Sequence, residues 1–289
     1  MSNNILNVIE KKMREFSKGQ RSIATYILNN YQKAAYMTAS KLGQAAGVSE
    51  STVVRFAFEL GYDGYPELQQ ELAEMMKNKL TSIQRIDVAT DQIGDTDVLD
   101  KILNIDIDKI KRTLEETSRE DFQGAVDALV NCKSIYILGS RSASVLARFL
   151  ALYFNLMFDS VKLIHTTSSS EMFEQIMRLK ENDIMIGISF PRYSKKTVKA
   201  LEFAKKSGAK VIAITDSPSS PLAKEADFFL QARSDMASFV DSLVAPLSLI
   251  NALIVAVGLQ MKDEIKQNFN HLETIWEEYD VYQKAEDNE

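Results

Sequence analysis

Residues 38–56 read TASKLGQAAGVSESTVVRF, and this stretch predicts two short helices joined by a tight turn. The first helix begins at Thr38 or Ser40, and Gly47 closes it, because glycine readily adopts the left-handed conformation that ends many helices. Ser49 then stands at the N-cap position of the second helix, and apolar residues follow it at helical spacing. The segment therefore predicts a helix-turn-helix unit.

The apolar and polar side chains of this segment are expected to lie on different faces. The residues expected to hold the two helices at a fixed angle are Leu42, Ala45, Ala46, Val48, Val53 and Val54. In helix-turn-helix proteins the start of the second helix enters the major groove of DNA. Hydroxyls can donate to phosphates or base edges there, and arginine can bind guanine through two donors. The candidate DNA-contacting residues are Ser40, Ser49, Glu50, Ser51, Thr52 and Arg55.

Two plainer interpretations of the same residues stay open. The two helices could form one more helical hairpin in a bundle, because Gly-Val-Ser turns also occur there. Arg55 could form a surface ion pair with Glu59, which follows four residues later on the same helix. The outward-facing polar run nevertheless favours DNA binding, and Arg55 is the first residue to test.

The flanking sequence predicts two domains. The first 80 residues are helical by their apolar spacing, residues 77–95 are polar and read as a linker, and a long amphipathic helix begins at Asp97. Beyond Lys133, short apolar runs alternate with helices, which indicates a parallel sheet covered by helices on both faces. These runs are Ile135–Leu138, Val161–Ile164, Ile184–Ile188, Val211–Ile214 and Phe228–Leu230. We expect a helix-turn-helix domain over 1–78, a linker over 79–96 and an α/β domain over 97–289.

Residues 38–66 resemble the N-terminal domain of the RpiR/MurR family of bacterial transcription regulators, and so does the stretch LGYDGYPEL at 60–68. The resemblance continues through nearly the whole chain. It implies an all-α DNA-binding head followed by an α/β sugar isomerase (SIS) domain that binds phosphosugars. It further implies a regulator of carbohydrate metabolism that binds double-stranded operator DNA.

The distribution of charge supports a DNA-binding head. Residues 1–60 hold eight Lys or Arg against four Glu, a net charge of +4, whereas residues 61–289 carry −10. A basic head on an acidic body is expected when only the head meets a polyanion, although the basic run could also be a solvated helix face. With no signal peptide, no apolar run of membrane length and the single cysteine Cys132, we expect a cytoplasmic protein with no membrane partner.

Polar loops follow three of the predicted strands, where ligands gather in open α/β sheets. They begin at Gly139, Ser189 and Thr215. Their glycine, hydroxyl groups and helix N-terminal amides suit a phosphate, although serine-rich turns also serve as plain helix caps. The candidate ligand-binding residues are Ser140, Arg141, Ser142, Ser189, Arg192, Ser194 and Glu171.

The resemblance to a SIS domain assigns two of these residues to its phosphate loop. Ser189 and Ser194 match the outer positions of the Ser-x-Ser-Gly-x-Thr pattern, but Pro191 and Arg192 replace its inner Ser and Gly. In the first loop, Arg141 and Ala143 depart from Gly-x-Gly-x-Ser in the same way. Arginines at these positions suit an acidic ligand. We therefore expect a phosphosugar or another anionic sugar derivative, with Arg141 and Arg192 as clamps; their alternative role is pairing with carboxylates at a subunit interface.

A SIS domain can also be an isomerase, and this activity is the alternative function. His165 and Glu171 could in principle serve as base and proton shuttle, and His271 is the second histidine. No nucleophile set, metal-ligand spacing or complete dinucleotide fingerprint is present, so we expect no catalytic residues, no metal and no cofactor. A further alternative is a SIS-fold regulator without a small-molecule effector.

The expected partners follow from this architecture. Helix-turn-helix proteins usually bind two half-sites as dimers, and the apolar helices at 97–116 and 241–282 are candidates for forming a homodimer or a higher homo-oligomer.

Overall fold

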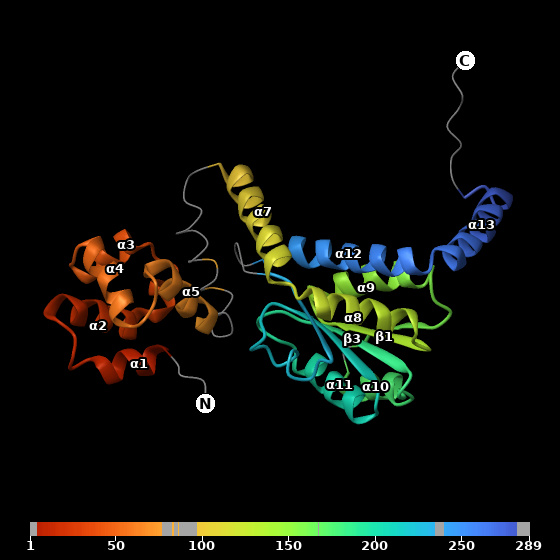
Figure 1. Cartoon of the computed structure of the whole chain (residues 1–289), viewed down its shortest axis with the longest axis horizontal. Helices are drawn as coiled ribbons and strands as arrows, with labels where there is room; N and C mark the ends of the chain where they lie inside the picture. Colours follow the sequence, from red (N-terminus) through yellow and green to blue (C-terminus); the bar gives the residue numbers. More distant parts are fainter. Residues whose placement is uncertain are drawn as a thin grey trace, which may run out of the picture. The chain divides into compact units, whose positions relative to one another are not determined.

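The computed structural model describes residues 5–76, 83, 86, 97–166, 168–234 and 240–281. It divides the chain into two compact units at Lys101–Ile102 (Figure 1). The predicted linker, residues 79–96, lies outside the described residues except for Ile83 and Ile86. The domain boundaries at 78 and 97 therefore stay a prediction.

The first unit is entirely helical in its described residues. Its helices are α1 (Ile5–Lys12), α2 (Lys18–Ala34), α3 (Ala39–Ala46), α4 (Glu50–Glu59) and α5 (Tyr65–Met76). Ser17 begins α2 with a capping box, because its hydroxyl accepts from the amide of Gln20 while the Gln20 side chain accepts from the amide of Ser17. The Phe16 and Phe56 rings, 5.1 Å apart between centroids, lie in the core of this unit.

The second unit alternates helices with strands. Its helices are α7 (Val98–Glu116, which starts just before the division), α8 (Arg119–Val130), α9 (Ala143–Phe154), α10 (Ser169–Ile176), α11 (Lys195–Lys206), α12 (Val244–Gln260) and α13 (Lys262–Glu278). Its strands are β1 (Ser134–Gly139), β2 (Val161–Leu163), β3 (Asp183–Ile188), β4 (Lys210–Thr215) and β5 (Phe228–Gln231). The described strands form one parallel sheet in the order β2-β1-β3-β4-β5.

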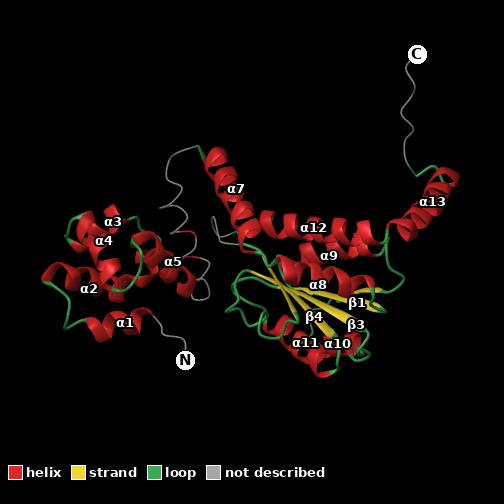
Figure 2. Ribbon diagram, viewed as in Figure 1, coloured by secondary structure: helices red, strands yellow, loops and turns green. Residues whose placement is uncertain are grey.

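Helices cover both faces of this sheet (Figure 2). Along β1, Ile135 and Ile137 join the core with α8, α9 and α12, whereas Tyr136 and Leu138 join the core with α10 and α11. This alternation follows from the two-residue period of a strand. The predicted fold class, a helical N-terminal domain and an α/β domain with a parallel sheet flanked on both faces, is confirmed, and each predicted apolar run is a strand.

The sheet leaves no space for a side chain where β1 turns into α9. A Cβ atom added to Gly139 would lie 2.3 Å from the carbonyl oxygen of Ala143 and 3.1 Å from the Cβ of Ala147. Both neighbours belong to the start of α9, so glycine is what lets this helix begin directly at the end of the strand. The loop that carries Ser140 depends on this close approach.

No single described helix is long and apolar enough to cross a membrane, and only α12 and α13 taken together, across a bend of 97°, pass by length and composition.

We predict opposite stability effects for two glycine substitutions in this unit. Gly139→Ala should lower the free energy of unfolding by about 1–3 kcal/mol, because its methyl group meets backbone that cannot move aside. Gly258→Ala is the matched control inside α12, where the nearest atoms to the new methyl lie at 3.6 Å, and it should be neutral or stabilising by up to about 1 kcal/mol. Urea unfolding followed by circular dichroism measures both; equal midpoints for the two variants would contradict the packing described.

Candidate DNA-binding helix and ligand site at the sheet edge

The turn between α3 and α4 has the geometry that the sequence predicts. Gly47 ends α3 in the left-handed region, with φ of +70°. The amide of Val48 donates to the carbonyl of Gly43 at 2.8 Å, and a Cβ on Gly43 would lie 2.9 Å from the carbonyl of Val48. Leu42 and Val53 are buried between the helices. The turn is therefore fixed by backbone contact as well as by apolar packing.

The predicted DNA-contacting residues lie at the surface of this unit. Ser40, Ser49, Glu50, Ser51 and Arg55 are exposed, and Thr52 is half-buried. The Ser49 hydroxyl makes no cap hydrogen bond; it lies 2.9 Å from the hydroxyls of both Ser51 and Thr52. The hydroxyls of these three residues thus lie together at the first turn of α4.

Two sequence-based expectations about these helices need correction. Ala45 was expected to pack between α3 and α4, but it is exposed and lines a groove beside α2. An ion pair between Arg55 and Glu59 was the alternative role of Arg55. Within the described part of the chain Arg55 forms no ion pair, and its Nε donates to the carbonyl of Ser51 at 3.4 Å. The backbone carbonyl of Glu59 accepts a hydrogen bond from Lys12 Nζ at 2.8 Å.

Hydroxyl groups from two loops meet at the carboxyl ends of β1 and β3. The Ser194 hydroxyl donates to that of Ser140 at 3.2 Å, and the amide of Ser194 donates to the Ser189 hydroxyl at 3.0 Å. Thr197 completes the group, with its hydroxyl 3.5 Å from that of Ser140. Ser189 and Thr197 are buried. We call Ser140, Ser189, Ser194 and Thr197 the hydroxyl cluster.

The remaining residues of the first and second loops lie outside the hydroxyl cluster. Arg141, Ser142 and Arg192 are exposed, and the Ser142 hydroxyl donates to Asp241 Oδ2 at 3.4 Å. Arg141 takes a left-handed conformation, with φ of +57°, at the start of the turn into α9. Among the described residues, neither Arg141 nor Arg192 forms an ion pair. Both guanidinium groups are thus available to an anion.

Glu171, in the first turn of α10, is linked to α11 through the loop that follows β2. Its carboxylate accepts a hydrogen bond from the hydroxyl of Thr166, and the carbonyl of Thr166 accepts from Lys196 Nζ at 2.7 Å. Lys196 stands between Ser194 and Thr197 in the sequence of the first turn of α11. The β2 loop is therefore tied to the helix that carries part of the hydroxyl cluster, although no contact joins Glu171 to the cluster itself.

Sequence reasoning missed several of these residues. Thr197 and Lys196 were not among the candidates, and only their place in the first turn after Ser194 could have singled them out. Tyr193 and Asp216 were also missed: the Tyr193 hydroxyl donates to Asp216 Oδ1 at 2.8 Å and ties the β3 loop to the end of β4. Asp216 is buried, and no local sequence pattern predicts that Tyr193 is its partner.

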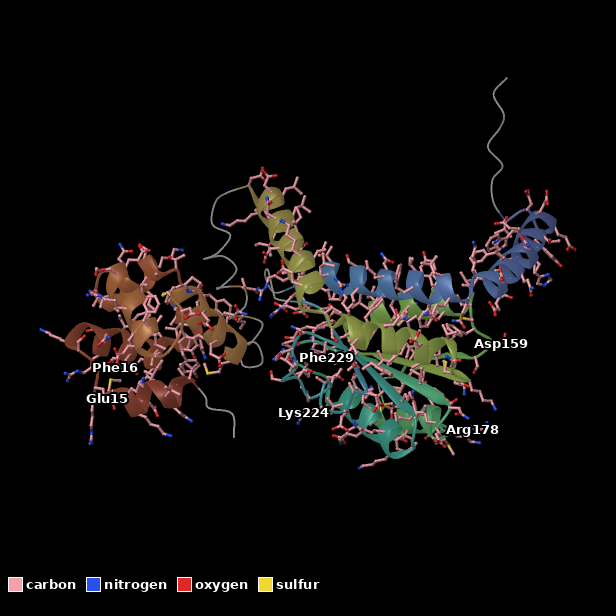
Figure 3. All side chains as sticks on the ribbon, in the orientation of Figure 1. Glu15, Phe16, Asp159, Arg178, Lys224 and Phe229 are labelled. Carbon is pink, nitrogen blue, oxygen red and sulfur yellow. The ribbon has the colours of Figure 1, made fainter. Side chains whose placement is uncertain are left out.

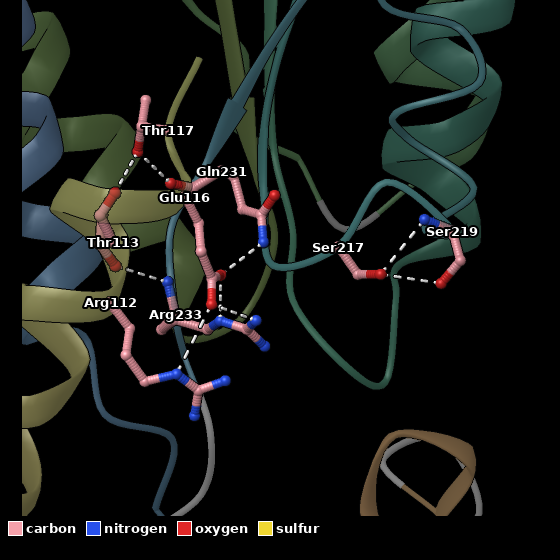
Figure 4. Close-up of polar contacts among 8 residues, drawn as sticks. All are labelled: Arg112, Thr113, Glu116, Thr117, Ser217, Ser219, Gln231 and Arg233. Carbon is pink, nitrogen blue, oxygen red and sulfur yellow. Dashed lines mark hydrogen bonds and ion pairs between the residues drawn. The ribbon is translucent and has the colours of Figure 1, made fainter. Parts of the chain in front are cut away.

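A second polar cluster fixes α7 to the end of β5 (Figure 4). The Glu116 carboxylate accepts from Arg233 through Nε and, at 2.6 Å, through Nη2, and also from Gln231 Nε2 at 2.7 Å. The amide of Arg233 donates to the Thr113 hydroxyl at 2.9 Å, while the Thr117 hydroxyl donates to the carbonyl of Gln231 at 2.8 Å. The C-terminal turns of α7 are thereby bonded to the strand that borders the sheet edge.

The two histidines and the single cysteine are the other candidate reactive side chains of the chain. His165 and His271 are exposed, and no described group of His, Cys, Asp or Glu could hold a metal ion. Burial raises the pKa of the Cys132 thiol to about 11, so this side chain is protonated at neutral pH. The polar groups of the site are hydroxyls, arginines and a carboxylate, which suit binding.

Comparisons with known proteins agree with this geometry. Residues 3–79 match the helix-turn-helix domain of the rpiR family, and residues 128–256 match the SIS domain. A helix-turn-helix transcription regulator with a SIS domain is thus the class of protein that the two units define. The chain belongs to the RpiR family of these regulators.

Relatives and solved structures of the same class cover most of the chain. An uncharacterized HTH-type transcriptional regulator of Caldanaerobacter subterraneus is 28% identical over 268 residues, 90% of this chain and 93% of the relative. The regulator HexR of Pseudomonas aeruginosa is 28% identical over 264 residues, 89% of this chain and 90% of its own.

Among solved structures, the sugar isomerase domain of an RpiR transcription factor from Sphaerobacter thermophilus has a TM-score of 0.59 at 24% identity, over 62% of this chain and 99% of that one. NanR of Vibrio vulnificus, solved in complex with ManNAc-6P, has a TM-score of 0.57 at 22% identity, over 94% of this chain and 99% of that one. Both structures have the same fold as the corresponding part of this chain.

The geometry of α4 predicts the effect of replacing Arg55. Arg55→Ala should weaken binding to an operator selected from a random DNA library by about tenfold to a hundredfold, because an arginine that reads a base contributes about 1–3 kcal/mol. Arg178→Ala is the matched control, since it removes the same charge from the exposed surface of the second unit (Figure 3). Fluorescence anisotropy measures both; equal affinities for the two variants would remove Arg55 from the DNA interface.

Proposed function

We propose that this regulator senses a phosphosugar or a related anionic sugar derivative at the carboxyl edge of its sheet, and that the ligand alters DNA binding by α4. The observation that carries the proposal is the hydroxyl cluster at the ends of β1 and β3. Ser140, Ser194 and Thr197 bring hydroxyls to one point, where α11 begins and the Ser194 hydroxyl accepts from the amide of Thr197 at 3.3 Å. Hydroxyl and amide donors around one point are the chemistry that binds phosphate oxygens.

The two arginines favour an anionic ligand over a neutral sugar. Arg141 and Arg192 are exposed on the loops that carry Ser140 and Ser189, and neither has a carboxylate partner among the described residues. Guanidinium groups bind phosphate and carboxylate through paired donors. Their alternative role at a subunit interface stays open, and the ligand-binding experiment below separates the two.

A known ligand supports the proposal by analogy alone. NanR of Vibrio vulnificus was solved with ManNAc-6P, and it has the fold of this chain at 22% identity. The identity of the ligand does not transfer at this distance, because Pro191 and Arg192 stand where the SIS phosphate loop has Ser and Gly. The effector is therefore proposed as a chemical class.

An isomerase activity is the weaker candidate function. The relatives carry names of transcriptional regulators, His165 is exposed, and the exposed Glu171 carboxylate is hydrogen-bonded to Thr166 rather than to the hydroxyl cluster. A base that removes a proton from a sugar carbon needs a free carboxylate or imidazole aimed at the substrate. Binding without turnover fits these residues better.

A regulator that acts on DNA is expected to work in the cytoplasm.

We further propose that the functional unit is a homodimer built on α7 and α12. Leu103, Ile107, Ile110 and Leu114 follow one another at intervals of four, three and four residues along α7, the spacing of a helix-pairing seam, and all four are exposed. α12 is apolar on all sides, which is typical of a helix that is buried by other protein segments all around. Beside them lies an apolar groove of about 570 Å³, and Val255 and Leu259 on its wall are 60% and 72% exposed.

A second copy of this chain is the partner that best fits the apolar surface. Operators read by helix-turn-helix proteins have two half-sites, which require two heads related by a two-fold axis. A two-fold interface pairs one surface with the same surface on the partner. The exposed apolar side chains of α7 on one copy could enter the groove beside α12 on the other copy, and the reverse. α7 is also the helix that follows the linker to the head, so pairing here would set the spacing of the heads.

The ligand site predicts a selective loss of affinity. In calorimetric titrations with a panel of hexose phosphates, N-acetylated hexosamine phosphates and phosphorylated sugar acids, Ser140→Ala should bind the best ligand about tenfold or more weakly, since a hydrogen bond to a charged group contributes about 1.5–3 kcal/mol. Arg192→Ala should lose affinity as well. Ser207→Ala, at the far end of α11, is the matched control; unchanged affinity in all three variants would refute the site.

The apolar surface predicts the oligomeric state. Light scattering on a sizing column should give a dimer mass for the wild type and a monomer mass for Leu114→Glu and Val255→Glu, because each substitution buries a charge in the proposed interface. Met177→Glu introduces the same charge at another exposed apolar side chain of the second unit and should remain dimeric. A monomeric wild type, or dimeric Leu114→Glu and Val255→Glu variants, would contradict the proposal.

A further inference from the structure

A polar groove runs along α2 in the helical unit, beside the turn that leads into α4. It has a volume of about 770 Å³. The residues on its walls that matter here are Lys18, Arg21, Thr25 and Asn29 of α2, with Ala45 and Ala46 of α3. The two alanines form the opposite wall, and their small side chains leave the groove open.

The groove is basic and contains no carboxylate. None of the residues that line it is acidic, and α2 itself has no Asp or Glu between Lys18 and Ala34. Lys18 and Arg21 are exposed, and neither is ion-paired within the described parts of the chain. Arg21 donates through Nε to the carbonyl of Phe16 at 2.9 Å, which orients the guanidinium and leaves its terminal nitrogens available.

One end of the groove adjoins the start of α4. A Cβ added to Gly19 would lie 3.3 Å from Cγ2 of Thr52 and 3.6 Å from Cγ1 of Val48. The first turn of α2 therefore packs directly against the turn that presents Ser49, Ser51 and Thr52. Lys18, the residue before Gly19, lines the groove. A DNA strand whose bases are read by α4 would pass within reach of it.

We propose that this groove binds the sugar-phosphate backbone of the DNA that flanks the base pairs read by α4. Lys18 and Arg21 lie three residues apart, so they share one face of α2 with a rise of about 4.5 Å between them. Thr25 and Asn29 continue this face, and the whole row extends over about 16 Å. Two cations followed by an uncharged hydroxyl and an amide make contacts that position a duplex without reading its sequence.

The proposal rests on DNA binding by α4 and extends it to residues that no part of the helix-turn-helix motif includes. Charge complementarity is the reason for choosing the backbone as the occupant: duplex DNA carries about one negative charge per 1.7 Å of its axis, and the groove offers two cations without a competing carboxylate. A peptide or a small anion in the same groove is an outcome that the experiment below separates.

The test compares salt dependences of DNA binding. Fluorescence anisotropy of the full chain, on a selected operator and on a scrambled duplex, would be measured between 50 and about 300 mM salt. The variants are Lys18→Gln, Arg21→Gln and the double variant, and Lys33→Gln is the matched control, because Lys33 lies on the same helix outside the groove. Circular dichroism confirms folding, and Thr25→Glu, which places a carboxylate in the groove, is an independent variant.

The proposal predicts a loss that does not depend on DNA sequence. The double variant should lower the slope of log affinity against log salt by about 1.8, or roughly 0.9 for each lost phosphate contact, and should weaken both duplexes by a similar factor. Thr25→Glu should weaken both as well, and Lys33→Gln should match the wild type.

Three results would overturn it. A wild-type slope and affinity in the double variant would exclude the groove while leaving operator reading by α4 intact. An equal loss in Lys33→Gln would reduce the effect to general charge, and a loss confined to the selected operator would assign these residues to base reading. A wild type that binds no duplex would instead refute the proposed function itself.

Discussion

The parallel pairing of β1 with β3 aligns Gly139 with Ile188. Ser140 and Ser189 are the next residues of the two strands, so this register alone brings their loops to the same point of the sheet edge. A shift by one residue would turn each of these side chains to the other face of the sheet. The register is fixed by cores on both sides, since Ile135 and Ile137 point into one and Tyr136 and Leu138 into the other. The hydroxyl cluster thus depends on apolar packing that never contacts a ligand.

The hydrogen bonds between Glu116 and Arg233 connect the end of β5 to α7. Arg233 follows β5, and its buried guanidinium is held by a carboxylate from the last turns of α7. The pair is partly buried and makes several hydrogen bonds, so it holds the two elements in one arrangement. Because α7 follows the linker, a ligand that displaced the chain after β5 would act on the segment leading to the head. Such coupling requires that the ligand bind two arrangements of the unit with different free energies.

The sequence predicted those parts of the protein that local patterns control. Gly47 and the apolar spacing around it determine the turn before α4, and the short apolar runs are strands because a parallel sheet buries both faces. Ser140, Ser189 and Ser194 were named as ligand-binding candidates because they follow strands, and their role stays a prediction. Thr197, Lys196 and the Tyr193–Asp216 pair were not found, since their roles depend on contacts between loops far apart in the chain. Ala45 was misplaced because helical spacing alone does not specify which side of a short helix its neighbour covers.

The central claim is that one ligand connects the hydroxyl cluster to operator binding, and thermodynamic linkage tests it most directly. Operator affinity would be measured with and without saturating phosphosugar, and phosphosugar affinity with and without saturating operator. If the two sites are coupled, the ligand changes operator affinity by some factor and the operator changes ligand affinity by the same factor. We predict a common factor of about 5 to 150. An operator affinity that is the same with and without bound phosphosugar would contradict the account.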